Sequence, residues 1–464
     1  MPDTPKSPPP ATRLLAEFAA DLSYDALPDR IQELMPILLT DLFRAAAVGR
    51  TMPWVEPAER VQMSLSGAPT SSIFFSDERA DPVRAAYING VIAGSLDWDD
   101  SHIAAIIHPG IVIWPAALAV AEKTKASGRA LVEAVTAGYE GAIRIGIAGQ
   151  PDHSLRGFQG TPTCGTFGAA IASARLLGLD AKGIQNAIGI AASYAGGISQ
   201  FFVSGSDVKR LHAGKAAAHG IEAALMAQTG LSGPPDAIEG RQGFGPAFSD
   251  SFDAAVIERD LGSHYWIDSI CLKVHAGTVR LQAAIEAAEQ LVRQGVTPDR
   301  IERVEIGVPQ LLMGKLTWNE PVDHQQAQMS APFAVAMTFM LAPERPDPFV
   351  LGIDDFGVCV KEAPVRDLSK RTVCVVDDAI DKQMTKEYVP ARVSVFLKDG
   401  KRLDATVIKP RGCPDNPITA DEVRERFRLM AGRYMAETVI ERWLEAAGAV
   451  HTLPSAADLM RWQP

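Results

Sequence analysis

Apolar residues recur at helical spacing over much of the first half of the chain. Between positions 11 and 49 the apolar residues lie three or four positions apart, as Phe18 and Leu22 do. Pro28 divides this region into two predicted helices. The same pattern continues from about 81 to 227. It predicts a large, mainly α-helical domain.

Two of these predicted helices are rich in small residues. Gly165, Gly168 and Ala172 lie in one of them, and Gly189 and Ala192 lie in the next. Small side chains allow helix axes to approach closely. We therefore interpret these glycines as packing positions in tightly packed central helices.

The pattern changes near residue 270, where apolar and polar residues begin to alternate. Segment 301–308 alternates as a strand does, and the β-branched run 371–376 could add another strand. Segments 391–397 and 402–407 flank Asp399-Gly400, which predicts a β-hairpin. A smaller α+β domain is therefore expected here.

The chain then returns to helix. Thr419 and Glu422 form a capping box, which predicts a long helical stretch through Ala447. We predict a mainly α fold in which the α+β domain is inserted into the helical one. The predicted parts are a disordered tail at 1–12, a helical domain at 13–270 and 412–464, and the inserted domain at 271–411.

Composition excludes several classes of partner. Of the 464 residues, 47% are hydrophobic and 22% are charged, which is typical of globular proteins. The formal net charge of -11 is spread along the chain, so nucleic acid and anionic membrane surfaces are poor partners. The apolar stretch 110–121 is shorter than the roughly 20 residues that a membrane span needs.

The termini and cysteines indicate a cytoplasmic protein. The first ten residues are polar and proline-rich, without the apolar segment of a signal peptide. The cysteines are odd in number and never spaced as C-x-x-C, which fits reduced thiols. They are Cys164, Cys271, Cys359, Cys374 and Cys413.

One group of residues is suited to proton transfer. It contains three carboxylates, Asp97, Asp99 and Asp100, and two imidazoles, His102 and His108. Crowded carboxylates raise each other's pKa, and imidazole titrates near neutral pH. The group could instead hold a divalent metal, but no second ligand motif follows. Acidic residues before a helix also often act only as caps.

Two further groups carry positive charge. If their segment is helical, Lys209, His212 and His219 share one face, which would suit a carboxylate-binding wall. A solvated helix face is the alternative. Lys273 and His275 lie where the two predicted domains meet, and ligand sites favour such junctions.

Taken together, these segments resemble the 2-methylcitrate dehydratase (MmgE/PrpD) family, which also contains cis-aconitate decarboxylase and iminodisuccinate epimerase. The resemblance implies a helical domain made from both chain ends, an inserted lid, a homodimer, and a site between the domains without metal or organic cofactor. Its motifs are Asn89-Gly90, Leu96 to Ser101, His108-Pro109, Pro115 to Leu118, Gly138 to Glu140 with Arg144, Gly165 to Leu179, and Lys209 to Gly214.

The resemblance also implies which residues form the site. Family catalytic positions carry over at Asp97, Ser101, His108, Lys209 and Lys273. With the neighbouring polar residues, we predict as catalytic Asp97, His108, Lys209 and Lys273. We predict as substrate-binding Ser101, His102, Gln159, His212 and His275.

Several positions depart from the family. Gly94 and Gln159 stand where the family has histidines, and Phe333 stands where a tyrosine is common. Thr278 and its neighbours replace the histidines that normally follow the lysine at the domain junction. These changes remove candidate acids and bases, so dehydration of a methylcitrate-like substrate does not transfer directly.

The predicted activity is that of a cofactor-independent lyase acting on a small di- or tricarboxylate, either a dehydratase or a decarboxylase. His108, oriented by Asp97, would act as the base, while Lys209 and Lys273 would stabilise the enolate-like transition state. The nearest alternative is an epimerase of a dicarboxylate such as iminodisuccinate. A metal-dependent terpene-type cyclase and a non-catalytic metabolite-binding homologue are alternatives of other classes.

Overall fold

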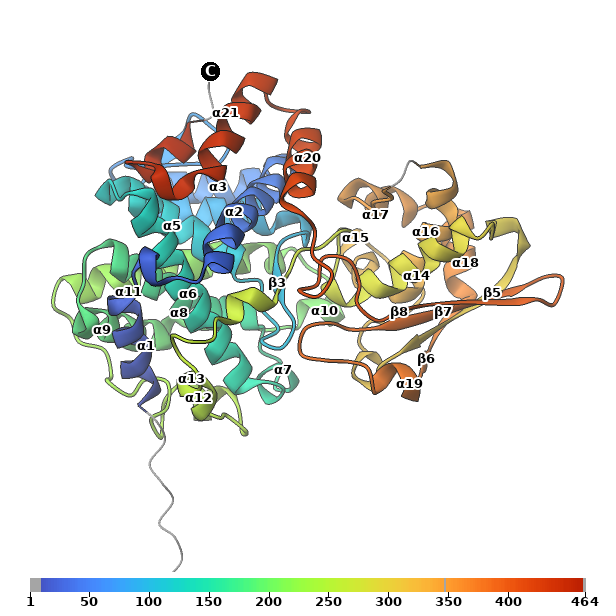
Figure 1. Cartoon of the computed structure of the whole chain (residues 1–464), viewed down its shortest axis with the longest axis horizontal. Coiled ribbons are helices and arrows are strands. Elements are labelled where there is room, and N and C mark those ends of the chain that lie inside the picture. Colours follow the sequence, from blue (N-terminus) through green and yellow to red (C-terminus); the bar gives the residue numbers. More distant parts are fainter. Residues whose placement is uncertain (1–9, 346–347, 462–464) are drawn as a thin grey trace, which may run out of the picture. The chain divides into compact units, whose positions relative to one another are not determined.

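The computed structural model describes residues 10–345 and 348–461, and these form two compact units (Figure 1). The first unit comprises the chain up to 95, then 99–270, and 419 onward; the second comprises 96–98 and 271–418. The fold is mainly helical, as predicted. Positions 1–9 of the predicted tail lie outside the described residues, whereas Ala11 and Thr12 already belong to the first helix.

The first unit consists almost entirely of helices. They are α1 Ala11–Asp21, α2 Asp29–Gly49, α3 Val55–Ser64, α4 Pro82–Ala93, α5 Gly110–Thr124, α6 Gly128–Gly149, α7 Asp152–Leu155, α8 Gly160–Leu176, α9 Ala181–Tyr194, α10 Phe201–Ser204, α11 Val208–Gln228, α12 Phe244–Phe248, α13 Ala255–Glu258, α20 Ala420–Ala431 and α21 Glu437–Gly448. The short strands are β1 Ser71–Ser72, β2 Arg79–Ala80, β3 Ser101–His102 and β4 Ile270–Cys271, which ends in the second unit.

Helices α5 and α8 form the centre of the first unit. Every residue of α5 from Gly110 to Glu122 is buried, and Arg175 is the one residue of α8 that is not. A helix that is buried on all sides must be covered by other helices. Helices α4, α6, α8 and α11 contact α5, and α6, α9 and α11 also contact α8. None of the described helices combines the length and apolar character that crossing a membrane requires.

The glycines of α8 are packing positions, as predicted. A methyl group on Gly168 would lie 2.6 Å from the carbonyl oxygen of Gly138 in α6. A methyl group on Gly138 would lie 2.7 Å from the carbonyl oxygen of Gly168. Helices α6 and α8 therefore touch backbone to backbone at this crossing, and any side chain would push them apart.

We expect the Gly168→Ala variant to lower the free energy of unfolding by about 1–3 kcal/mol, because the added methyl group overpacks this crossing. The matched control is Gly448→Ala at the exposed end of α21, where a methyl group meets no atom within 4 Å. That change should be neutral or stabilise by up to about 1 kcal/mol. Urea unfolding of the two variants provides the comparison, and equal midpoints would contradict the packing role.

A buried ion pair fixes the loop that follows α13. The Nε of Arg144 donates to Glu140 at 3.0 Å, and its other nitrogens donate to the carbonyl oxygens of Arg259 and His264 at 2.7 Å. Glu140 also accepts from the backbone N–H of Ile267 at 2.9 Å. These two residues of the family-like motif therefore have a structural role in the first unit.

The second unit contains a four-stranded sheet in the order β6-β5-β7-β8. Strand β5, Ile301–Val308, runs parallel to β6, Thr372–Val376, and antiparallel to β7, Ala391–Leu397. Strand β8, Arg402–Val407, completes the hairpin around Gly400. The predicted strands and hairpin are thus confirmed.

Helices cover one face of this sheet (Figure 1). Helix α14 contacts β7 and β8, while α16 and α18 contact β6. The unit's helices are α14 Gln282–Arg293, α15 His324–Ala327, α16 Ala331–Leu341, α17 Ile353–Cys359, α18 Ala363–Lys370 and α19 Asp378–Asp381.

The predicted helical stretch through Ala447 is two helices rather than one. The capping box is present, since Glu422 N donates to Thr419 at 3.3 Å and Thr419 N donates to the Glu422 carboxylate at 2.9 Å. Helix α20 ends before Gly432, whose flexible backbone makes it a poor helix former. The break allows both α20 and α21 to pack against α2.

Candidate active site

Asp100 fixes the loop that precedes the central helix α5. Its Oδ1 accepts from the backbone N–H of Gly110 at 3.0 Å, and its Oδ2 accepts from the Tyr139 hydroxyl at 2.8 Å. A methyl group on Gly110 would lie 2.7 Å from Oδ1, so glycine is required there. Asp100 is buried, and both of its carboxylate oxygens are used in holding the loop.

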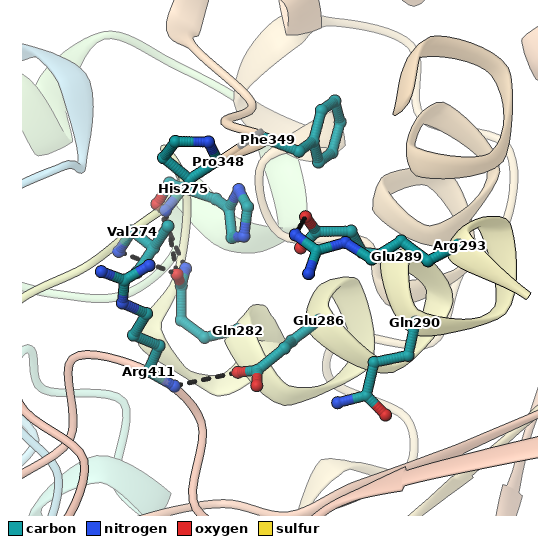
Figure 2. A pocket seen from close by; sticks show the side chains of 10 residues that line it. All are labelled: Val274, His275, Gln282, Glu286, Glu289, Gln290, Arg293, Pro348, Phe349 and Arg411. Atoms are coloured by element: carbon teal, nitrogen blue, oxygen red, sulfur yellow. Dashed lines mark hydrogen bonds and ion pairs between the residues drawn. The ribbon is translucent and has the colours of Figure 1, made fainter. Parts of the chain in front are cut away.

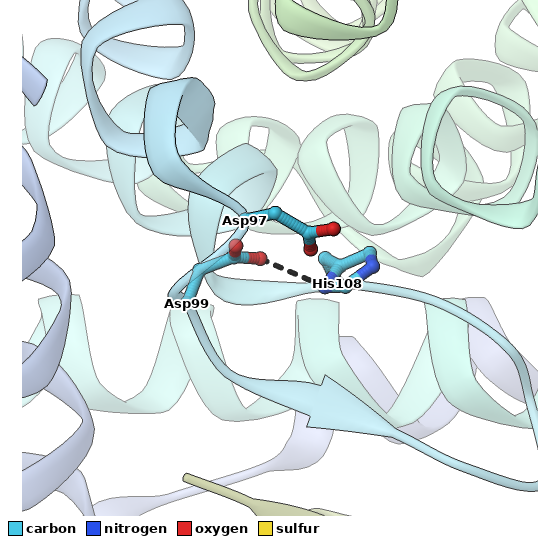
Figure 3. A group of neighbouring side chains, drawn as sticks. All are labelled: Asp97, Asp99 and His108. Carbon is cyan, nitrogen blue, oxygen red and sulfur yellow. Dashed lines mark ion pairs between the residues drawn. The ribbon is translucent and has the colours of Figure 1, made fainter. Parts of the chain in front are cut away.

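His108 lies at the end of this loop with one ring nitrogen held by three oxygens. Its Nδ1 is 2.8 Å from the Asp99 carboxylate (Figure 3). The same nitrogen is 3.0 Å from the Ser101 hydroxyl and 3.1 Å from the Asp100 carbonyl oxygen. The carboxylate and the carbonyl can only accept, so Nδ1 carries a proton, and Nε2 is the ring nitrogen that these three oxygens do not hold. The His108 side chain is 20% exposed and that of Asp99 is 2% exposed. A buried carboxylate therefore orients an accessible imidazole.

Asp97, the predicted partner of His108, lies close to it, because ligand-type atoms of Asp97, Asp99 and His108 are within 4.8 Å of one another. Asp97 belongs to the second unit, where Lys273 Nζ donates to its carboxylate and to its carbonyl oxygen, both at 2.8 Å. Gly277 N also donates to the Asp97 carbonyl at 3.1 Å. Asp97 has a left-handed backbone conformation with φ of 52°. Its side chain therefore points in a different direction from the side chain of an extended residue. Asp99 was in the predicted acidic cluster, but its role was missed.

On helix α11, His212 contacts Gln159, a predicted substrate-binding residue. The His212 Nδ1 is 2.6 Å from Gln159 Oε1. Burial, followed by the charges of Lys215 and Lys209, lowers the pKa of His212 to about 4. His212 is therefore neutral at pH 7, and its Nδ1–H donates to the amide oxygen of Gln159. The predicted cationic face is thus made by the lysines rather than by His212.

The two lysines of this face have different surroundings. Lys215 Nζ donates to the carbonyl oxygen of Gly196 at 2.8 Å. Lys209 is partly buried at the start of α11, and its Nζ lies 5.9 Å from the centre of the Phe202 ring. The sequence placed Lys209 and His212 on one face, and the electrostatic effect of Lys209 on His212 agrees with that prediction.

His102 and His275 are both buried and both use Nδ1 as an acceptor. His102 accepts from Ala105 N at 3.1 Å, and burial lowers its pKa to about 3, so it is neutral. His275 accepts from Leu351 N at 3.1 Å and is 3% exposed. The His275 ring lines a cavity of about 140 Å³ within the second unit, beside Phe349 and above α14 (Figure 2). Each ring therefore keeps its proton on Nε2.

Two of the substituted family positions have been filled by apolar packing. A methyl group on Gly94 would lie 3.1 Å from Ile111 Cδ1 and 3.4 Å from Ala213 Cβ, so the space for a larger side chain is occupied. Phe333 is fully buried in α16. Neither position can supply an acid or a base.

A metal ion is the other chemistry that this loop could support. Among the described residues, Asp97, Asp99 and His108 form a group of ligand-type side chains. The Asp97 carboxylate is already bound by the ammonium group of Lys273 at 2.8 Å. A divalent cation would have to displace or repel that ammonium, so the donor set fits an ion pair better than a metal.

The buried Asp100 gives the protein a pH-dependent stability. Burial, and then the charge of Asp99, raise the pKa of Asp100 to about 7 from an ordinary value of 3.8. The folded protein therefore retains a proton that the unfolded chain has lost, and the free energy of unfolding falls as pH rises from about 4 to 7.

Between about pH 4 and 7, the free energy of unfolding of the Asp100→Asn variant should fall less than that of the wild type, because asparagine does not titrate. Urea unfolding at pH 4.5, 5.5, 6.5 and 7.5 measures it, with Asp21→Asn at the exposed end of α1 as the control. Parallel curves for the wild type and both variants would show that Asp100 does not contribute.

Comparisons with known proteins identify the family of the chain. Residues 13–257 match the MmgE/PrpD N-terminal domain, and residues 275–451 match the MmgE/PrpD C-terminal domain. The cis-aconitate decarboxylase-like protein oryM of Aspergillus oryzae is 28% identical over 97% of this chain and 95% of its own. Human cis-aconitate decarboxylase is 26% identical over 97% of this chain and 93% of its own.

A third relative, cis-aconitate decarboxylase of Aspergillus terreus, is 24% identical over 93% of this chain and 91% of its own. The two domain matches together cover most of the described residues of both units. The resemblance seen in the sequence motifs is confirmed, and the chain belongs to the MmgE/PrpD family.

Proposed function

We propose that this protein is a lyase acting on a small di- or tricarboxylate, and that it decarboxylates cis-aconitate or a close analogue. The observation that carries the proposal is the pairing of His108 Nδ1 with the buried Asp99, which leaves Nε2 for proton transfer. The names of the relatives, all cis-aconitate decarboxylases or similar to them, support decarboxylation over dehydration.

The reaction needs an acid and fixed positive charge. When CO₂ leaves, the electron pair of the broken C–C bond moves into the conjugated system, and the double bond shifts. Negative charge then builds on the remaining carboxylate until a proton is added to carbon. One proton is consumed and one CO₂ is released. The protonated form of His108, stabilised by Asp99, is the proposed proton donor, and solvent restores its proton.

Lys209 is the proposed source of positive charge from the first unit. It lies at the start of α11, on the face that also carries His212. Because Gln159 uses its oxygen to accept from His212, its amide nitrogen is the proposed donor to a substrate carboxylate. Ser101, whose hydroxyl lies 3.0 Å from His108, is a second proposed substrate contact.

Asp97 and Lys273 enter the proposal as the pair that positions the loop. Both side chains are at most 2% exposed. Only Trp98 separates Asp97 from Asp99, so two residues of extended chain, about 7 Å, are the greatest possible distance between their Cα atoms. The buried pair therefore anchors the segment that carries the partner of His108. His102 and His275 remain predicted substrate-binding residues, and the proposal assigns no chemistry to them.

The test is proton NMR of the purified protein in D₂O with cis-aconitate, citrate, methylcitrate and iminodisuccinate, each with and without EDTA. We expect loss of cis-aconitate, release of CO₂ and one solvent deuterium in the product, all unchanged by EDTA. Water loss from citrate or methylcitrate would mean a dehydratase. Deuterium exchange without loss of substrate would mean an epimerase, and inhibition by EDTA would overturn the cofactor-free mechanism.

A further inference from the structure

The first turn of helix α8 lies against the loop that ends at His108. Gly160 begins this helix, and a methyl group on it would lie 2.6 Å from the carbonyl oxygen of Ile106. That distance leaves no room for a side chain, so the helix start and the loop touch backbone to backbone. Both segments belong to the first unit. The start of α8 is therefore a rigid support for the loop.

A side chain of this turn also binds the backbone of His108. The Thr161 hydroxyl accepts from the backbone N–H of His108 at 3.1 Å. Thr161 is 2% exposed, so little water reaches this bond. An N–H group that loses its acceptor away from water is unfavourable, because the lost hydrogen bond is not replaced. The Thr161 hydroxyl therefore holds the backbone of His108 in place.

Two other threonines near the start of α8 bond in a different direction. Thr163 donates to the carbonyl oxygen of Gln159 at 2.9 Å, and Thr166 donates to that of Pro162 at 2.8 Å. Both hydroxyls thus bond to the carbonyl four residues earlier, as threonines inside a helix often do. Thr161 instead bonds to a residue 53 positions away in the sequence. Its hydroxyl therefore supports the loop rather than its own helix.

The bond from Thr161 complements the contact with Asp99. Asp99 lies 2.8 Å from Nδ1 of His108 and holds the ring, whereas Thr161 holds the backbone from which the ring extends. A ring held at one point can swing about that point, but two points fix where Nε2 is directed. The same helix start carries Gln159, whose side chain oxygen is 2.6 Å from Nδ1 of His212. The first turn of α8 therefore holds both histidines.

We propose that Thr161 is a positioning residue of the active site, whose hydroxyl fixes the backbone of His108 and so directs Nε2 toward the substrate. The effect on catalysis rests on the proposed function, whereas the orientation of the ring rests on the hydrogen bond itself. Thr161 was not singled out from the sequence, because the partner of a hydroxyl in the first turn of a helix is visible only in three dimensions.

The Thr161→Val variant tests this role, because valine nearly keeps the shape of threonine and lacks the hydroxyl. We expect kcat on cis-aconitate to fall by about tenfold while KM changes by less than about threefold. Thr161→Ser keeps a hydroxyl and should keep kcat within about threefold of the wild type. The matched control is Thr166→Val, at a buried position of the same helix, which should stay within about twofold. Equal losses in Thr161→Val and Thr161→Ser would overturn the proposal, because the methyl group would then be the cause.

The nitrogen NMR shifts of the His108 ring give a readout that does not depend on turnover. Protein labelled with nitrogen-15 histidine provides them, and the signals that disappear in His108→Ala are those of His108. We expect Thr161→Val to move the Nδ1 shift of His108, and Thr166→Val to leave it unchanged. An unmoved shift or a wild-type kcat in Thr161→Val would refute the positioning role alone. If the wild type does not turn over cis-aconitate, the proposed function fails, and the nitrogen shift still decides whether Thr161 orients the ring.

Discussion

The His108→Ala variant should lower kcat on cis-aconitate by about 10²-fold or more, since it removes the group proposed to donate the proton to carbon. His108 is the partly exposed member of the Asp99 pair, so its loss should leave the fold intact. Steady-state CO₂ release measures kcat, and a thermal melt checks the fold. The matched control is His264→Ala, an exposed histidine of the same unit, which should retain wild-type kcat.

The Asp99→Asn variant separates orientation from contact with the substrate. Asp99 is buried against Nδ1 of His108, so it should affect kcat by orienting the His108 ring rather than by binding the substrate. We expect kcat to fall by about tenfold or more while KM changes by less than about threefold. Full turnover by His108→Ala would reject the proton-transfer role, and a rise in KM alone for Asp99→Asn would mean that Asp99 binds the substrate.

Local signals explain why so much of the fold could be predicted. The hairpin around Gly400 follows from Asp-Gly between two alternating segments, and the start of α20 follows from its capping box. Both depend on residues within a few positions of one another. The break at Gly432 was missed because its cause is partly distant, namely the packing of α20 and α21 on the same helix α2.

Sequence motifs indicated which residues lie close together, but not how each of them is held. The ion pairs that the structure adds are His108 with Asp99 and Lys273 with Asp97. Asp97 also has a left-handed backbone, with φ of 52°. No composition or spacing rule predicts a left-handed aspartate, because the conformation is stabilised by partners that are 176 positions away in the sequence.

Gly94, where the resemblance implies a missing histidine, shows the same limit. The sequence indicates only that an imidazole is missing and leaves open whether a neighbour compensates for it. In the structure, Ile111 and Ala213 occupy the space beside Gly94. The change is thus a packing change shared by three segments of the first unit, and it removes an acid or base without leaving a cavity.

Breaking the Asp97–Lys273 pair should be strongly destabilising. Both charges are almost fully removed from water, so loss of one partner leaves the other buried and uncompensated, at a cost of about 3–5 kcal/mol. Asp97→Asn is the suitable variant because asparagine tolerates the left-handed backbone and nearly preserves the shape. Lys273→Met should have a similar effect, as measured by urea unfolding.

The double variant distinguishes lost pairing from lost shape. With Asp97→Asn and Lys273→Met together, neither position of the pair carries a charge, so the loss should be clearly smaller than the sum of the two single losses. The exposed pair Lys370–Glu320, whose side chains are 51% and 55% exposed, is the matched control. Lys370→Met and Glu320→Gln should each change the free energy of unfolding by less than about 1 kcal/mol. Additive losses at Asp97 and Lys273 would mean that each residue acts alone, and the pair would then not anchor the segment that carries Asp99.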